Sequence, residues 1–158
     1  MRQYQFIKSE LKRLQVSDAL TGCANREYFQ QEIIKASHIC QRYKINMSMI
    51  SLHINEPSKQ IALLGGQQFD QYLISLAQVW SSRLRNTDVL CRYSEEMFVV
   101  LLPSTALESA LLLTDDLIKS SNEYDFNFNC QINIEIHTKT MTHDGIESWQ
   151  DWLNSAVF

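Results

Sequence analysis

The chain has 158 residues, of which 45% are hydrophobic and 20% charged, and its formal net charge at pH 7 is -4. This composition excludes a disordered chain, and the length fits one domain with a core of its own. The negative charge argues against broad nucleic-acid binding, which depends on neutralising phosphates, but it leaves room for a local basic pocket that holds one small anion.

Cysteines and histidines, four of each, are spread widely along the chain, and no CxxC pair occurs. The spacing therefore predicts neither a disulfide framework nor a structural zinc site, and reduced thiols in the cytoplasm are expected. The sequence contains no run of 18 apolar residues and opens on no signal peptide, so we expect no direct membrane contact by this segment. If the parent protein is membrane-attached, this segment is expected to be its cytoplasmic part.

The first predicted element is a helix over residues 1–16, in which Tyr4, Ile7, Leu11 and Leu14 form one apolar stripe at helical spacing. Two interpretations stay open. The helix packs on its own domain, or it belongs to a parallel dimeric stalk that runs in from an upstream module and makes the protein a homodimer. We therefore divide the chain into an N-terminal helix or stalk, residues 1–16, and a domain over residues 17–158.

The next stretch predicts a turn, a helix, a strand and a loop. Asn25 follows a turn and is a candidate N-cap for a helix over residues 26–43. Residues 47–54, "MSMISLHI", alternate and carry enough β-branched side chains for a strand. Residues 55–60, "NEPSKQ", are predicted to form a loop.

The second half of the chain begins with Gly65 and Gly66, which precede a helix with one apolar face. Two strands joined by a short turn at Ser94–Glu95 predict a β-hairpin. A helix, an alternating strand and a short last helix follow, over residues 106–120, 128–140 and 146–158. This order is the ferredoxin-like α/β (α+β) arrangement, in which helices cover the faces of a mixed or antiparallel sheet.

Three stretches carry motifs at fixed offsets. "DALTGCANREYF", residues 18–29, resembles the D-x-L-T-G-L-x-N-R opening of GGDEF domains. "RNTDVLCRYSEEMF", residues 85–98, resembles that family's R-x-x-D, five residues and then the G-G-D/E-E-F signature. "FDQYLISLAQVW", residues 69–80, lies where the family has G-D-x-x-L-x-x-x-A. The resemblance implies a GGDEF, ferredoxin-like palm with a central five-stranded mixed sheet flanked by helices.

Active members of this family are diguanylate cyclases, so the resemblance also implies a chemistry to look for. Two domains face each other, each with one GTP, and a divalent metal assists the attack of a 3'-hydroxyl on an α-phosphate. Such a site needs metal-ligating carboxylates and a turn that phosphates can approach closely, for which glycine is suited.

The signature of this chain departs from the active pattern. It consists of Ser94, Glu95, Glu96, Met97 and Phe98, so both glycines are missing. Glu96 matches the family's metal-binding acid, whereas Met97 replaces the carboxylate that follows it. Glu95 would bring a side chain and a negative charge to the place where guanine and phosphates approach.

Other positions of the implied active site have changed as well. His53 replaces a metal-binding Asp, Ser58 a phosphate-contacting Lys and Ile61 a guanine-reading Asn, while Asp70 is kept. A metal held by His53 and Glu96 is an alternative, but magnesium prefers several oxygen ligands. We therefore expect a degenerate domain without a functional magnesium site, cofactor or enzymatic activity.

The upstream motif is retained. In the family, R-x-x-D is the inhibitory site that binds the product, cyclic di-GMP, and Arg85 and Asp88 keep it at the family's distance from the signature. Arginine offers a planar fork to a guanine edge or a phosphate, and aspartate accepts from guanine N–H groups. Arg83 and Arg92 lie close in sequence and are further candidates for the ligand site. The alternative is that Arg85 and Asp88 form only a surface salt bridge.

The sequence thus predicts a catalytically inactive GGDEF domain that acts as a cyclic di-GMP receptor, with a protein partner in a signalling, biofilm or secretion pathway. Two alternatives stay open: a nucleotide-independent dimerisation or protein-interaction scaffold, and a residual cyclase or GTP-binding regulator. Arg85 separates the receptor from the scaffold, because only the receptor needs it.

Overall fold

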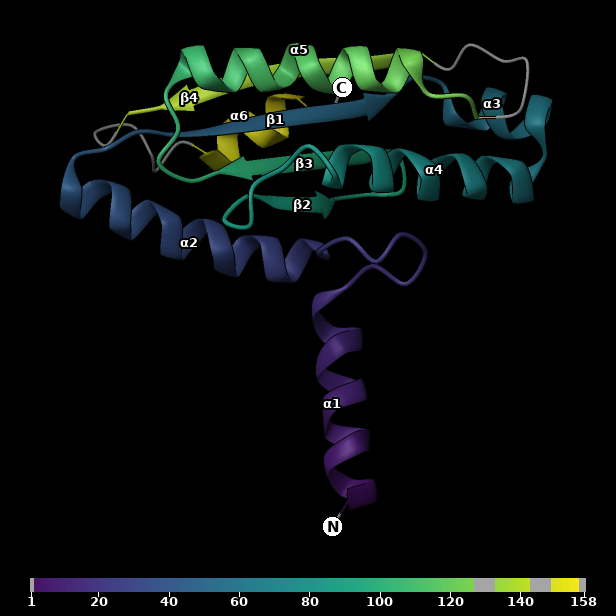
Figure 1. Cartoon of the computed structure of the whole chain (residues 1–158), viewed down its shortest axis with the longest axis horizontal. Coiled ribbons are helices and arrows are strands. Elements are labelled where there is room, and N and C mark those ends of the chain that lie inside the picture. The colour runs from purple at the N-terminus through teal and green to yellow at the C-terminus, as the bar shows by residue number, and fades with distance from the viewer. Residues whose placement is uncertain (1, 127–132, 143–148, 157–158) are drawn as a thin grey trace.

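The computed structural model describes residues 2–126, 133–142 and 149–156. In chain order its elements are α1 (Arg2–Val16), α2 (Arg26–Tyr43), β1 (Met47–Ile54), α3 (Pro57–Leu64), α4 (Gly66–Ser81), β2 (Val89–Arg92), β3 (Met97–Leu102), α5 (Leu107–Glu123), β4 (Ile134–Met141) and α6 (Trp149–Ala156). Figure 1 shows the helices arranged around one sheet, with α1 apart from them.

The sheet has the strand order β2-β3-β1-β4, and each neighbouring pair is antiparallel. This order confirms the ferredoxin-like arrangement. The predicted five-stranded mixed sheet is wrong for the described residues, which form four strands without a parallel neighbour pair. The helical crossovers do make β1 parallel to β2 and β3 parallel to β4, but β3 and β1 lie between the members of these pairs. Part of the strand predicted over residues 128–140 lies outside the described residues.

The central strand β1 is buried on both faces, because helices cover both sides of the sheet. Ile50, Leu52 and Ile54 belong to a core cluster with α4 and α5. Met47 and Met49 alternate with them and belong to a second cluster with α2 and α6. The period of two that predicted a strand therefore distributes the side chains of β1 between two cores.

Residues 55–60, predicted as loop, lie partly in a helix, because α3 begins at Pro57. Proline is accepted in the first turn of a helix, where its missing N–H has no intrahelical partner to lose. Glu56 in front of it has a φ of 49°, which turns the chain sharply from β1 into α3. The prediction placed Pro57 in a loop, whereas it is the first residue of a helix.

Helix α1 extends away from the sheet and the other helices (Figure 1). Tyr4 and Ile7, two members of the predicted stripe, are 69% and 56% exposed. The side chains of Leu11 and Leu14 lie outside the described residues. For the described half of the stripe, the arrangement favours a stalk over a helix packed on its own domain. Among the described helices, none is both long and apolar enough to cross a membrane.

Candidate functional site

The R-x-x-D motif forms a closed turn between α4 and β2. The Asp88 N–H donates to the Arg85 carbonyl at 3.0 Å, and the Arg85 N–H donates to Asp88 Oδ2 at 2.9 Å. Aspartate suits this turn because its short carboxylate accepts from nearby backbone N–H groups. The structure therefore brings the two predicted ligand-binding residues together.

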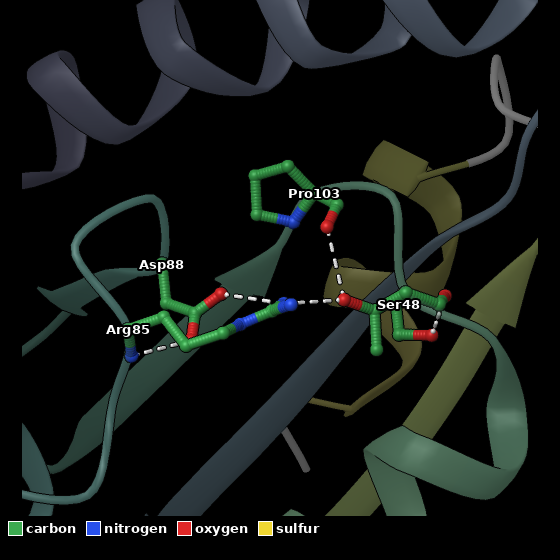
Figure 2. A network of polar contacts seen from close by, with 5 residues as sticks. Ser48, Arg85, Asp88 and Pro103 are labelled. Atoms are coloured by element: carbon green, nitrogen blue, oxygen red, sulfur yellow. Dashed lines mark hydrogen bonds and ion pairs between the residues drawn. The ribbon is translucent and has the colours of Figure 1, made fainter.

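The two side chains of this motif also bind each other (Figure 2). Arg85 Nε donates to Asp88 Oδ2 at 3.3 Å, and Arg85 Nη2 donates to Asp88 Oδ1 at 3.1 Å. The Asp88 side chain is 1% exposed, whereas that of Arg85 is 60% exposed. The guanidinium is thus presented to solvent by a buried carboxylate. In this conformation Asp88 faces Arg85 and is shielded from a ligand.

A second partner of Arg85, Thr105, was missed by the sequence reasoning. Arg85 Nη2 donates to Thr105 Oγ1 at 2.7 Å, and the Thr105 hydroxyl donates to the Pro103 carbonyl at 2.9 Å (Figure 2). Ser48 Oγ, on β1, donates to the Thr105 carbonyl at 2.7 Å. The segment after β3 is therefore anchored to the sheet at the point where it meets Arg85.

Arg83, a further predicted ligand residue, has a different partner from Arg85. Its Nη1 is 3.7 Å from Asp116 Oδ1 on α5, and both side chains are about half exposed. Arg83 also borders an open groove of about 390 Å³ near the C-terminal ends of α4 and α5. The other lining residues of the groove are Gln78, Val79, Ser82, Ser120, Glu123 and Tyr124.

Arg92, the other further candidate, lies at the opposite end of β2 from the R-x-x-D turn. Its side chain is 14% exposed, and Nη1 is 3.3 Å from both carboxylate oxygens of Asp18. Nη2 donates to the Glu95 carbonyl at 3.1 Å. Arg92 therefore joins the opening motif of the domain to the signature turn, and its contacts are not shared with Arg85.

The Asp18 carboxylate is held on its other side by Thr21. The Thr21 N–H and hydroxyl donate to Asp18 Oδ2 at 2.9 and 2.7 Å. Burial by itself raises the pKa of Asp18, but the hydrogen bonds from Thr21 and the charge of Arg92 outweigh it, so the pKa lies below its ordinary value. The ionised carboxylate is thus the form that stabilises this junction.

We expect Asp18→Asn to lower the free energy of unfolding at pH 7 by about 1–3 kcal/mol, the range for hydrogen bonds to charged groups. Because the folded pKa is lowered, this contribution is present above the unfolded pKa and is lost as the pH falls through the folded value. Urea unfolding at stepwise lower pH should therefore show the wild type and the variant converging below about pH 4.

The matched control for this experiment is Glu95→Gln, which neutralises an exposed carboxylate at the same end of the domain. It should leave the free energy of unfolding within about 0.5 kcal/mol of the wild type. A difference between wild type and Asp18→Asn that stays constant down to about pH 2 would contradict the role given to Asp18.

The signature residues form the predicted hairpin turn. The N–H groups of Tyr93 and Ser94 donate to the Met97 carbonyl at 2.8 and 3.1 Å. Ser94 and Glu95 are exposed and Glu96 is half-buried. Met97 and Phe98, by contrast, are fully buried and belong to the two different core clusters. Where the signature has its second carboxylate, this chain has a core residue.

His53 lies beside this turn at the end of β1. It lies opposite Met97 on β3 and opposite Glu135 on β4. The N–H of the next residue, Ile54, donates to the Glu96 carbonyl at 2.8 Å. Asp70 is exposed on α4. Within the described residues, no group of three or more His, Cys, Asp or Glu side chains is arranged to hold a metal ion. One imidazole and one carboxylate fit magnesium poorly.

Comparison with known proteins connects this architecture to one family. Residues 15–157 match the family model described as diguanylate cyclase, GGDEF domain. The chain is 27% identical over 143 residues to the diguanylate cyclase DgcS of Shewanella oneidensis, covering 88% of this chain and 47% of the relative. It is 30% identical over 117 residues to the diguanylate cyclase DgcM of Escherichia coli, covering 70% and 27%. The chain thus spans less than half the length of these relatives.

Solved structures with the same fold include the coiled coil and GGDEF domain of DgcB from Caulobacter crescentus in complex with c-di-GMP. Its TM-score is 0.85 at 17% identity, over 98% of this chain and 85% of that one. The GGDEF domain of FimX from Pseudomonas aeruginosa gives 0.79 at 21%, over 88% and 87%. The diguanylate cyclase SiaD from the same organism, in complex with its activator SiaC, gives 0.78 at 21%, over 98% and 60%.

Proposed function

This chain belongs to the GGDEF family of diguanylate cyclase domains, and we propose that it is a catalytically inactive member that serves as a cyclic di-GMP receptor. Its relatives are diguanylate cyclases, and GGDEF structures of the same fold contain c-di-GMP. Similarity alone assigns neither cyclase activity nor c-di-GMP binding to this chain. The proposal depends on what the individual residues of this chain can do.

The observation that carries the receptor proposal is the presentation of Arg85. Its side chain is 60% exposed and its guanidinium is held in one orientation by Asp88, so little side-chain freedom remains to be lost on binding. A planar, fixed fork is suited to a guanine edge or a phosphate. Asp88, buried behind it, acts as a positioning residue in this conformation. The geometry of a surface ion pair is therefore compatible with a ligand site.

The proposal of inactivity depends on the signature turn and its neighbours. Ser94 and Glu95 replace the glycines, Met97 is a core residue and His53 stands where the family has a metal-binding acid. These changes obstruct the close approach of phosphates and leave Glu96 without the further carboxylate ligands that a magnesium site needs. The proposal therefore includes neither a magnesium cofactor nor turnover of GTP.

Calorimetric titration tests the receptor proposal directly. We expect saturable heat when cyclic di-GMP is added to the purified chain, and none when GTP is added with magnesium. Absence of cyclic di-GMP binding by folded protein at high ligand concentration would defeat the receptor and favour a scaffold. Binding of GTP with magnesium alone would favour a GTP-binding regulator.

The scaffold alternative is favoured by a separate observation, the apolar surface of α1. Tyr4, Phe6 and Ile7 are all more than half exposed on a helix that extends from the domain. Such a surface is suited to pairing with a second copy. A stalk dimer and a ligand site are compatible, so we propose a cytoplasmic, homodimeric receptor that passes its signal to a protein partner.

We expect the full chain to have the mass of a dimer in light scattering, and a chain that lacks residues 1–16 to have the mass of a monomer. Removal of the stalk takes away the exposed apolar side chains of Tyr4, Phe6 and Ile7, and no α1 side chain that the structure describes belongs to either core cluster. A monomer in both cases at high protein concentration would exclude the stalk dimer. It would leave the receptor proposal intact, because Arg85 lies outside the stalk.

A further inference from the structure

The donors of the Arg85 guanidinium are divided unequally between two edges. One edge, formed by Nε and Nη2, faces the carboxylate of Asp88 with contacts of 3.3 and 3.1 Å. The other edge is formed by Nη1 and Nη2. At this edge the second N–H of Nη2 donates a hydrogen bond to Thr105 Oγ1, with an Nη2–Oγ1 distance of 2.7 Å. In the free protein, neither edge therefore offers two unoccupied N–H groups in parallel.

A guanine edge or a phosphate is read in a bidentate way by two parallel N–H groups of one arginine edge. The Nε/Nη2 edge is closed to a ligand, because the carboxylate that occupies it is 1% exposed and ionic contacts of this kind are the stronger ones. The Nη1/Nη2 edge belongs to a side chain that is 60% exposed, and a single hydroxyl occupies half of it. A bidentate ligand must therefore use this edge.

We propose that the Thr105 hydroxyl caps the ligand-reading edge of Arg85 and that cyclic di-GMP binds in competition with it. Thr105 is 5% exposed and is anchored by its own bond to Pro103 and by the bond from Ser48 to its carbonyl. Because Thr105 is anchored in this way, a ligand that accepts from both Nη1 and Nη2 must break the contact between Nη2 and the Thr105 hydroxyl. Asp88 remains bound to the opposite edge throughout. This inference rests on the proposed receptor function and adds a closed state to it.

The test is a comparison of Thr105→Val with Thr105→Ser in cyclic di-GMP titrations. Valine keeps the size and branching of the side chain but removes the competing hydroxyl, and serine keeps the hydroxyl. We expect Thr105→Val to bind about 3- to 10-fold more tightly than the wild type, the effect of one hydrogen bond. Thr105→Ser should bind like the wild type. In an Arg85→Ala background, Thr105→Val should change the affinity no further.

Folding is checked by thermal unfolding, because valine leaves the Pro103 carbonyl without the hydroxyl donor. If Thr105→Val does not fold, Thr105→Ala gives the same test with less crowding. Affinity equal to or below that of the wild type in the folded variant overturns the cap. A gain that persists in the Arg85→Ala background overturns it too. If neither the folded wild type nor folded Thr105→Val binds, the receptor function itself is wrong.

Discussion

Replacing Arg85 with alanine is expected to weaken cyclic di-GMP binding by about 5- to 150-fold. The range corresponds to about 1–3 kcal/mol for a charge-assisted hydrogen-bonded contact. The guanidinium is exposed and held in one orientation, so its removal takes away a prepared contact rather than a mobile charge. Calorimetric titration of wild type and variant under the same buffer and salt conditions measures the difference.

Three further variants make this result specific. Arg85→Lys should restore binding only in part, because an ammonium group cannot make the bidentate contact. Asp88→Ala should weaken binding as well, by loss of the carboxylate that orients Arg85. Glu96→Ala should bind like the wild type, because the signature turn lies at the other end of β2. With folding checked by circular dichroism, equal affinities for wild type and Arg85→Ala would defeat the receptor proposal.

Most elements of the fold could be predicted because their signals are local. Asn25 does cap α2, with its Oδ1 accepting from the Tyr28 N–H at 2.8 Å. The alternation in β1 and the hairpin turn are also local patterns, and both are confirmed. Pro57 shows the limit of such signals. The same residue ends a helix or starts one, and only the sharp turn at Glu56 decides between these outcomes.

The ferredoxin-like arrangement could be predicted, but not whether its sheet is mixed or antiparallel throughout. The predicted mixed sheet requires at least one parallel neighbour pair, yet which strands become neighbours is decided by how the whole chain packs. Insertion of β3 beside β1 separates every parallel pair of the described sheet. A pattern read along the sequence does not contain this information.

The candidate site shows a similar division. Motif spacing identified Arg85 and Asp88, and the structure brings them together. The motif spacing gave no indication that Asp88 is buried behind Arg85, since burial depends on the segments that cover the turn. Thr105 is 20 residues away in the chain and meets Arg85 only because β3 ends beside the turn. Arg92 is much nearer in sequence, but β2 carries it to the other end of the strand, where it binds Asp18.

We expect the purified chain to form no cyclic di-GMP from GTP with either magnesium or manganese. An active site of this family must bring two nucleotides together and neutralise the charge that develops on the transferred phosphate. Here the half-buried Glu96 is the carboxylate that remains at the signature, and His53 on β1 lies opposite the next residue, Met97. Restoring the turn with the double variant Ser94→Gly, Glu95→Gly should also give no product, because glycines supply space but no metal ligands.

The activity assay is decisive when it is read together with Glu96→Ala. Product that accumulates in proportion to enzyme and disappears in Glu96→Ala would show that the remaining carboxylate supports turnover, and the inactive assignment would be wrong. Product that is insensitive to Glu96→Ala would point to a contaminating cyclase. Because Arg85 and the signature turn lie at opposite ends of β2, the two activities can be separated by single substitutions. A protein that binds cyclic di-GMP through Arg85 and makes none with Glu96 would be a receptor that retains the product site of a cyclase without its chemistry.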